Sequence, residues 1–301
     1  MMTTVMKYSS IKKISVFGRL IRPEHWIKNL LVFVALFFSF SFDRNAFYQA
    51  TLAFIAFSLF ASSIYIINDI FDKEKDRLHP LKRKRPIASG KIRIWQAIII
   101  ALVLIVLAVL LSYFISEKLL LIGIVYFVLN LSYSISLKHI PIVDTMIVAL
   151  GFVLRVMAGA YAIDVSISHW LLLCTFFISL FLAFGKRKHE MSILDLQGER
   201  KHRKSIAEYT EGFISQMLAI TAGISVVFYS LYTIDPSTVS RFGSDNLIYT
   251  TPIVVFGVLR YFYLLYNKND GGDPVNIFSK DLPLILDVVA WIVAVLLIYY
   301  F

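Results

Sequence analysis

Charge is scarce in this chain. Of its 301 residues, 17% are charged and 58% are hydrophobic, whereas a soluble globular protein carries about 25% charged and about 45–50% apolar residues. Apolar runs of about 18 residues or more, the length that crosses a bilayer as a helix, occur repeatedly. The composition excludes an ordinary soluble domain and predicts an all-α polytopic membrane protein.

Cysteine is also nearly absent. The single residue, Cys174, excludes a disulfide within the chain, and its apolar neighbours favour a small core residue over a reactive thiol. No small-residue cleavage site follows the basic N-terminal stretch, so the first apolar run is expected to be an uncleaved span. Short-period repeats and low-complexity linkers are lacking too, which favours one transmembrane domain over residues 1–301.

Nine apolar runs are expected to form membrane-spanning helices, because in hydrocarbon every backbone N–H needs a partner within its own segment. The expected spans are 27–42, 47–67, 94–115, 119–137, 142–163, 167–185, 214–234, 247–266 and 282–301.

Most of the 30 Lys and Arg residues fall in alternate loops. Only Arg44, Lys118 and Arg241 lie on the opposite side, and Arg155 and Arg260 lie within spans. Positive charge marks the cytoplasmic face, which predicts a cell-membrane protein with its N-terminus inside and its C-terminus outside. Since the basic excess follows topology and no nucleic-acid-reading module is visible, no nucleic-acid partner is expected.

Orientation does not explain the aspartates in "NDIFDKEKD", which follow the second span. On a helix of 3.6 residues per turn, Asp72 and Asp76 lie about 300° and about 700° on from Asp69, so the three share one face with Asn68 on its shoulder. Carboxylates at this spacing repel one another unless a cation lies among them. Oxygen ligands converging at the end of a span suit Mg2+, and a solvated helix end is the alternative.

A run of cations follows directly: Lys82, Arg83, Lys84 and Arg85 in "HPLKRKRPIASG". Cations beside a metal–carboxylate site suit an anionic substrate with several phosphate oxygens. Phospholipid headgroups compete as partners for the same side chains.

A second charged stretch follows the sixth span. It begins with Lys186, Arg187 and Glu190 and continues with Asp195 and Glu199 at i, i+4. The charge pattern assigns it to the same cytoplasmic side, so both stretches are expected to line one cavity.

Charges within spans are functional by default. Asp144 and Arg155 lie eleven residues apart in the fifth span, on one helical face, and Arg260 lies near the inner end of the eighth. A structural salt bridge is the alternative for Asp144. The last cytoplasmic loop holds Asp273 and Asp281 beside a Gly271–Pro274 turn, whose role stays open.

The chain resembles the UbiA-type intramembrane prenyltransferase superfamily over nearly its whole length, and within it the decaprenyl-phosphate phosphoribosyltransferase branch. The stretches that carry the resemblance are "RPEHWIKNLLVF", "NDIFDKEKDRLHPLKRKRPIASG", "YSISLKHIPIVDTMIVALGFVLRVMAGA", "KRKHE", "RYFYLLY", "GGDP" and "SKD". Typical aromatic prenyltransferases of the superfamily carry two aspartates at i, i+4 in the second motif. The Lys-Arg-x-x-Glu found here departs from that pattern and favours the phosphoribosyl branch.

The resemblance implies Mg2+-dependent transfer of phosphoribose from 5-phosphoribosyl diphosphate to a polyprenyl phosphate, with diphosphate as leaving group and the site facing the cytoplasm. Asp69, Asp72 and Asp76 would be catalytic and, with Asn68, would hold the metal; whether one or two Mg2+ bind stays open. The implied substrate-binding residues are Lys28, Lys82, Arg83, Arg85, Tyr133, Asp144, Arg155, Lys186, Arg187, Glu190 and Arg260.

Two other functions fit parts of the pattern. The acidic motif alone suits an enzyme that moves a prenyl chain from its diphosphate to an aromatic or tetrapyrrole acceptor, although the basic loop argues against it. A transporter would use Asp144 and Arg155 as its pathway, but no inverted repeat is apparent. Metal dependence of donor binding discriminates the enzymes from the transporter. Polyprenyl chain length and assembly into a homo-oligomer stay open.

Overall fold

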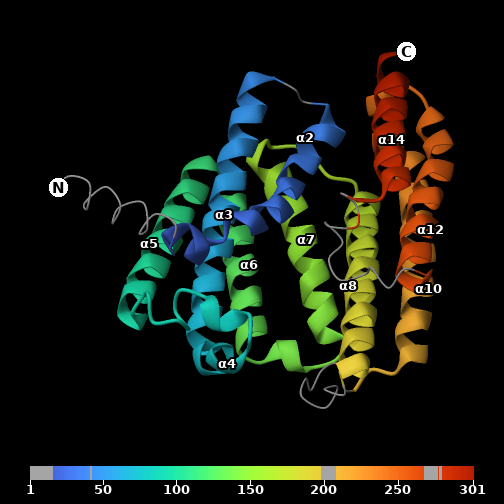
Figure 1. Ribbon diagram of the computed structural model, residues 1–301. Coiled ribbons are helices and arrows are strands. Elements are labelled where there is room, and N and C mark those ends of the chain that lie inside the picture. Colours follow the sequence, from blue (N-terminus) through green and yellow to red (C-terminus); the bar gives the residue numbers. More distant parts are fainter. Residues whose placement is uncertain (1–15, 41–42, 198–207, 268–276, 278–279) are drawn as a thin grey trace, which may run out of the picture. The chain divides into compact units, whose positions relative to one another are not determined.

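The computed structural model describes residues 16–40, 43–197, 208–267, 277 and 280–301, with the side chains of α8 (His169–Gln197) described as far as Ser192. All regular structure in these residues is helical (Figure 1). Contacts divide the chain into two compact units: Met1–Leu137 with Leu154–Val165, and Lys138–Val153 with Ser166–Phe301. One long helix, α7 (Val143–Ala162), contributes its first half to the second unit and its second half to the first.

The first unit is built around α3, which packs along α5 and α6 and carries η1 on its side (Figure 1). Asp43 caps the start of α3 by accepting hydrogen bonds from the N–H groups of Asn45 and Ala46. The elements are η1 (Pro23–Phe33), α2 (Val34–Ser39), α3 (Arg44–Phe71), α4 (Lys73–Leu78), η2 (Lys82–Lys84), α5 (Ile94–Ile115) and α6 (Glu117–Ile135). A short η3 (Leu137–His139) follows.

In the second unit α8 and α10 pack along each other, and α12 packs against α14. Their shared core includes Phe181, Leu218 and Tyr261. The elements after the first half of α7 are α8 (His169–Gln197), α10 (Glu211–Thr233), α11 (Pro236–Phe242), η5 (Asn246–Thr250), α12 (Thr251–Asn267) and α14 (Leu282–Tyr300).

Eight helices in the described part of the chain are long and apolar enough to cross a membrane. They coincide with the second to ninth expected spans. The first expected span, 27–42, is divided between η1 and α2, of 11 and 6 residues, and α2 ends at Phe40 in the left-handed conformation (φ 52°). Neither piece reaches the length of a span, so the count of nine is not confirmed.

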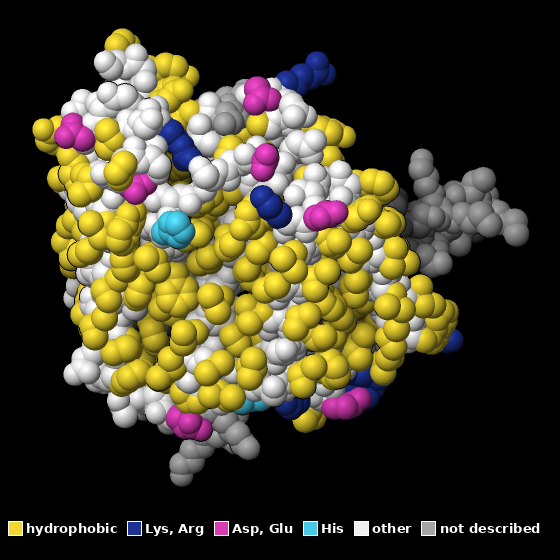
Figure 2. All heavy atoms as spheres, turned by 180° about the vertical axis from the view of Figure 1, so that it is seen from behind, with side chains coloured by type: hydrophobic (Ala, Val, Ile, Leu, Met, Phe, Trp, Pro, Cys, Tyr) yellow, Lys and Arg dark blue, Asp and Glu magenta, His cyan; other side chains and the backbone are white. Residues whose placement is uncertain are grey.

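The outer surfaces of these helices remain apolar. Leu102 on α5 and Val293 on α14 are 56% and 48% exposed, and both belong to rows of exposed Leu, Val and Ile. Figure 2 shows hydrophobic side chains covering most of the face in view, with few charged ones. Exposing so much apolar surface to water would be unfavourable, whereas contact with lipid is not. The chain is a multi-pass integral membrane protein.

Within the first unit, η1 lies against α7 at a glycine. A Cβ built on Gly159 would lie 1.8 Å from the carbonyl oxygen of Val32, a backbone atom that no side-chain rotation removes. Gly159 therefore allows the close approach that holds η1 in place.

We predict that Gly159→Ala destabilises the protein by about 3 kcal/mol, the upper end of the usual cost of overpacking, because the backbone of η1 must move. Thermal unfolding in detergent measures the change. Gly223→Ala in α10 is the matched control, since nothing lies within 4 Å of its added Cβ, and it should be neutral or slightly stabilising. Equal melting temperatures for the two variants would contradict the proposed contact.

Candidate active site

The acidic motif lies where α3 ends. Asp69 is in the last turn of α3 and Asp76 is in α4, and both are buried, with 1% and 3% exposure. Between them Asp72 forms the junction of the two helices: its N–H donates to the carbonyl of Asn68, and its own carbonyl accepts from the N–H of Asp76. The helical path thus continues through the junction and brings Asp69 and Asp76 to one face, as expected, while Asn68 and Asp72 are partly exposed.

Two arginines bind these carboxylates. Arg22 donates from Nη2 to both oxygens of Asp69, at 2.6 and 2.7 Å. Arg85 donates from Nη1 to Asp69 at 3.0 Å and to Asp76 at 2.6 Å. The four side chains form an ion-pair cluster that joins the N-terminal segment, the end of α3 and the loop after η2, and we call it the carboxylate–arginine cluster. Paired guanidinium groups offset the cost of burying two carboxylates.

Arg22 has an unusual backbone. It precedes Pro23 and adopts the left-handed conformation, with φ 53° and ψ 61°. A non-glycine residue in this region costs of order 1–3 kcal/mol and persists only where its surroundings over-determine it. The two hydrogen bonds to Asp69 and the position of its guanidinium 5.4 Å from the Tyr65 ring centroid supply that constraint.

The carboxylates fit a divalent cation in their chemistry. Oxygens of Asp69 and Asp76 converge on a single cationic atom, Nη1 of Arg85, and Mg2+ prefers such oxygen ligands completed by water and substrate phosphate. The described residues nevertheless contain no group of three His, Cys, Asp or Glu side chains placed to hold a metal ion. The structure therefore brings two of the three aspartates together, and Asp72 does not join them.

Other candidates of the first unit are spread over several elements. Lys82 and Arg83 lie in η2, with Arg83 exposed; Lys28 on η1 and Tyr133 on α6 are partly buried. Arg155, by contrast, is 7% exposed and donates to Asn29 at 2.7 Å and to the Tyr126 hydroxyl at 2.8 Å. Its guanidinium carbon also lies 4.8 Å from the centroid of the Tyr126 ring.

The second unit holds its own charged cluster. Asp144, fully buried in the first turn of α7, binds Nη2 of Arg187 at 2.9 Å and accepts a 2.9 Å hydrogen bond from the Tyr209 hydroxyl. Arg187 also binds Glu190 at 2.6 Å. Asp144 therefore forms the salt bridge that was the alternative to a role in substrate binding, while Lys186 beside it is exposed.

Tyr209 fixes this cluster to the backbone. Its hydroxyl accepts from the N–H of Ile142 at 2.5 Å, and Ile142 is in the left-handed conformation with φ 69°, a genuine outlier for a β-branched residue. Burial, followed by the effect of the neighbouring Asp144, raises the pKa of Tyr209 to about 12. The hydroxyl thus stays protonated at physiological pH and acts as a donor to Asp144.

Arg260 on α12 binds Asp281, which caps α14. The Nε and Nη2 atoms of Arg260 donate to the two carboxylate oxygens of Asp281 at 3.1 and 2.9 Å. The same carboxylate accepts from the N–H of Leu284. This pair joins α12 to the start of α14. The side chain of Asp195, residue Glu199, and the Gly271–Pro274 turn with Asp273 lie outside the described residues.

Four of the side chains in these networks were not singled out from the sequence: Arg22, Asn29, Tyr126 and Tyr209. Arg22 and Asn29 do lie in or beside the "RPEHWIKNLLVF" stretch that carries the resemblance. Tyr126 and Tyr209 have no local signal, because each is placed by a partner at least 29 residues away.

Together, eight membrane-length helices and a carboxylate–arginine cluster at the end of one of them characterise, in the described residues, an integral membrane protein with buried, paired charges. The UbiA prenyltransferase family model matches residues 29–279, and the chain belongs to this family.

Two relatives are the decaprenyl-phosphate phosphoribosyltransferases of Mycolicibacterium smegmatis and Corynebacterium glutamicum. Each is 35% identical to this chain; the matches cover 90% and 93% of it and 88% and 85% of the relatives. Among solved structures, a UbiA homologue from Archaeoglobus fulgidus bound to GPP and Mg2+ superposes with a TM-score of 0.72. That match covers 95% of this chain and all of the homologue at 19% identity, which supports the fold alone.

The buried Asp144–Arg187 pair yields a test of its role. Removing one partner of such a pair costs about 3–5 kcal/mol, because a charge stays buried without its counter-charge. We therefore expect Arg187→Gln to lower the free energy of unfolding by that amount, and the Asp144→Asn/Arg187→Gln double variant to recover most of it. Chemical unfolding in detergent measures the wild type, the single variants Asp144→Asn and Arg187→Gln, and the double variant.

The exposed Glu74–Arg77 pair is the matched control, and its Gln variants should change stability by no more than about 1 kcal/mol. Additive losses in the Asp144–Arg187 cycle would show that the two charges do not stabilise each other.

Proposed function

We propose that this protein transfers the 5-phosphoribosyl group of 5-phosphoribosyl diphosphate to a polyprenyl phosphate and releases diphosphate. The observation that carries the proposal is the similarity to the two phosphoribosyltransferases, which extends over nine-tenths of the chain. The donor set of the carboxylate–arginine cluster supports it, because this chemistry involves several phosphate groups and a divalent cation.

In the reaction the bond between ribose C1 and the diphosphate oxygen breaks, and C1 forms a bond to an oxygen of the acceptor phosphate. Positive charge develops on the sugar, and the diphosphate leaves with the bonding electron pair. The acceptor is already an anion, so no strong general base is needed. The protein must instead position two anions that repel each other and stabilise the charge of the leaving group.

The residues divide these tasks. Asp69, Asp72 and Asp76, with Asn68, would hold Mg2+, which stabilises the charge that develops on the diphosphate. The cations Arg85, Lys82 and Arg83 would bind phosphate oxygens. Guanidinium groups suit this role because they donate two parallel hydrogen bonds to phosphate.

Residues of the other networks have supporting roles in this proposal. The substrate-binding residues of the proposal further include Lys28, Tyr133, Arg155, Lys186, Arg187 and Glu190. Asp144 would position Arg187, and Arg260 would act with Asp281 at the start of α14. Following the positive-inside pattern, the N-terminus and the acidic motif face the cytoplasm, where the water-soluble donor is found.

Asp72→Asn separates function from folding, because Asp72 is partly exposed and lies outside the carboxylate–arginine cluster. We expect about a 10²–10³-fold loss of kcat, typical of losing a group that stabilises transition-state charge, with little loss of stability. The assay offers 5-phosphoribosyl diphosphate, Mg2+ and a polyprenyl phosphate to the purified protein in detergent and measures the phosphoribosylated lipid.

Glu74→Gln is the control, since it removes one negative charge from the same stretch at a side chain that is 75% exposed. A chelator should abolish product formation by the wild type. If a prenyl diphosphate were consumed with an aromatic acceptor and no phosphoribosyl lipid formed, the family would stand and the proposed donor would be wrong.

A further inference from the structure

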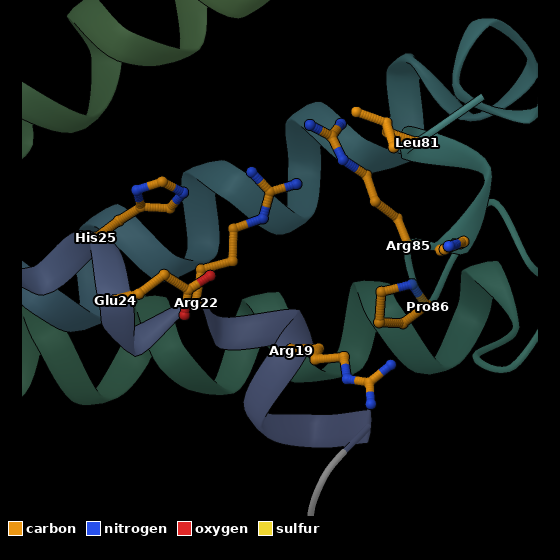
Figure 3. Close-up of a pocket in the computed structure, with 8 residues that line it drawn as sticks. Arg19, Arg22, Glu24, His25, Leu81, Arg85 and Pro86 are labelled. Carbon is orange, nitrogen blue, oxygen red and sulfur yellow. The ribbon is translucent and has the colours of Figure 1, made fainter. Parts of the chain in front are cut away.

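A second cationic feature adjoins the carboxylate–arginine cluster. A pocket of about 330 Å³ lies in the first unit between the Arg19–His25 segment and the Leu81–Pro86 loop (Figure 3). Four of its eight lining residues are cations: Arg19, Arg22, Lys84 and Arg85. Glu24 is its one acidic residue, and only Leu81 and Pro86 are apolar.

The cations of the pocket are of two kinds. Arg22 and Arg85 line it and also bind Asp69 and Asp76; Figure 3 shows them coming from separate segments with their guanidinium groups close together. Arg19 and Lys84 are exposed, and neither side chain forms an ion pair within the described residues. The pocket thus contains two cations beyond those that neutralise the buried carboxylates.

The lining selects the chemistry of a ligand. An open pocket with four cations and little apolar surface suits a compact, water-soluble anion, because a lipid chain would need apolar walls to leave water. Guanidinium and ammonium groups together match the oxygens of a phosphate monoester.

We propose that this pocket binds the phosphate monoester at C5 of the phosphoribosyl donor. The inference rests on the proposed function, in which the donor carries a diphosphate at C1 and a monoester at C5. Asp69, Asp72 and Asp76 would then bind the diphosphate through Mg2+, and the neighbouring pocket would bind the monoester. Arg22 and Arg85 belong to both sites, which explains why the second site adjoins the first. Arg19 and Lys84 are binding residues for the monoester alone.

Ribose 5-phosphate is the probe, because it carries the monoester without the diphosphate. It is titrated calorimetrically into the full chain in detergent, without Mg2+ and at about 50 mM salt so that exposed charges are weakly screened. The Arg19→Ala/Lys84→Ala variant should bind it at least about tenfold more weakly, the loss expected for charge-assisted hydrogen bonds. Ribose itself should not bind.

The matched control is Arg77→Ala/Lys91→Ala, which likewise removes one arginine and one lysine, but from exposed positions outside the pocket. It should bind ribose 5-phosphate within about twofold of the wild type. If both double variants bound ribose 5-phosphate equally more weakly, the loss would reflect only the lower net charge, and the proposal would be wrong. The proposal would also be wrong if the wild type did not bind ribose 5-phosphate at millimolar concentration.

A competition experiment with a polyprenyl phosphate tests whether the pocket binds the phosphate of the donor or that of the acceptor. If a short-chain polyprenyl phosphate displaces ribose 5-phosphate and loses affinity equally in the pocket variant, the pocket serves the acceptor and the proposal is wrong. Retained lipid binding in the pocket variant, together with lost ribose 5-phosphate binding, supports it.

These binding readouts need no turnover, so the two proposals fail separately. Loss of ribose 5-phosphate binding in the pocket variant supports the subsite even if no phosphoribosyl lipid is formed, in which case the proposed function is wrong. If the wild type has transfer activity and the pocket variant binds ribose 5-phosphate as well as the wild type does, the proposed function stands and the proposed monoester subsite is wrong.

Discussion

The first unit depends on one buried ion-pair cluster, in which Asp69 is bound by Arg22 and Arg85. A carboxylate with 1% exposure at the end of a membrane helix would be strongly destabilising without a counter-charge. Its partners come from residues 47 positions before and 16 positions after it in the chain. The same interaction that neutralises the charge therefore fixes the N-terminal segment and the basic loop against α3, and it also forms the walls of the cationic pocket.

The second unit solves the same problem in the same way. Asp144 is fully buried at the start of α7, and a guanidinium group from α8 neutralises it. In both clusters a non-glycine residue in the left-handed conformation lies beside the carboxylate: Arg22 binds Asp69 directly, and the N–H of Ile142 supports Tyr209, which donates to Asp144. Backbone strain at both places shows that positioning these charges outweighs local conformational preference.

Local patterns in the sequence predict part of this arrangement. Apolar runs locate eight of the helices, since lipid demands long helices of apolar residues, and the spacing of Asp69 and Asp76 predicts their common face. Hydropathy does not predict that the first expected span is made of η1 and α2 instead of one long α-helix. The close approach of Val32 to Gly159, far away in the chain, likewise has no local signal. Arg22 and Tyr209 are not predictable either, because a long-range partner leaves no periodic signal. The acidic motif predicts that its carboxylates need a cation nearby. Only the tertiary structure shows that Arg22 and Arg85 supply the positive charge.

That distinction bears on how the site works. With no ligand bound, Asp69 and Asp76 are neutralised by Arg22 and Arg85. A substrate that brings phosphate groups together with a divalent cation offers the carboxylates and the arginines new partners at once. On the proposed function, Asp69 and Asp76 would exchange a guanidinium nitrogen for the cation, while Arg22 and Arg85 would exchange carboxylate for phosphate. The metal or the diphosphate alone would leave either the carboxylates or the arginines of the cluster without a counter-charge, at a cost of several kcal/mol. The cluster is therefore suited to bind the metal and the diphosphate together, whereas Arg19 and Lys84 can bind the monoester without opening these ion pairs.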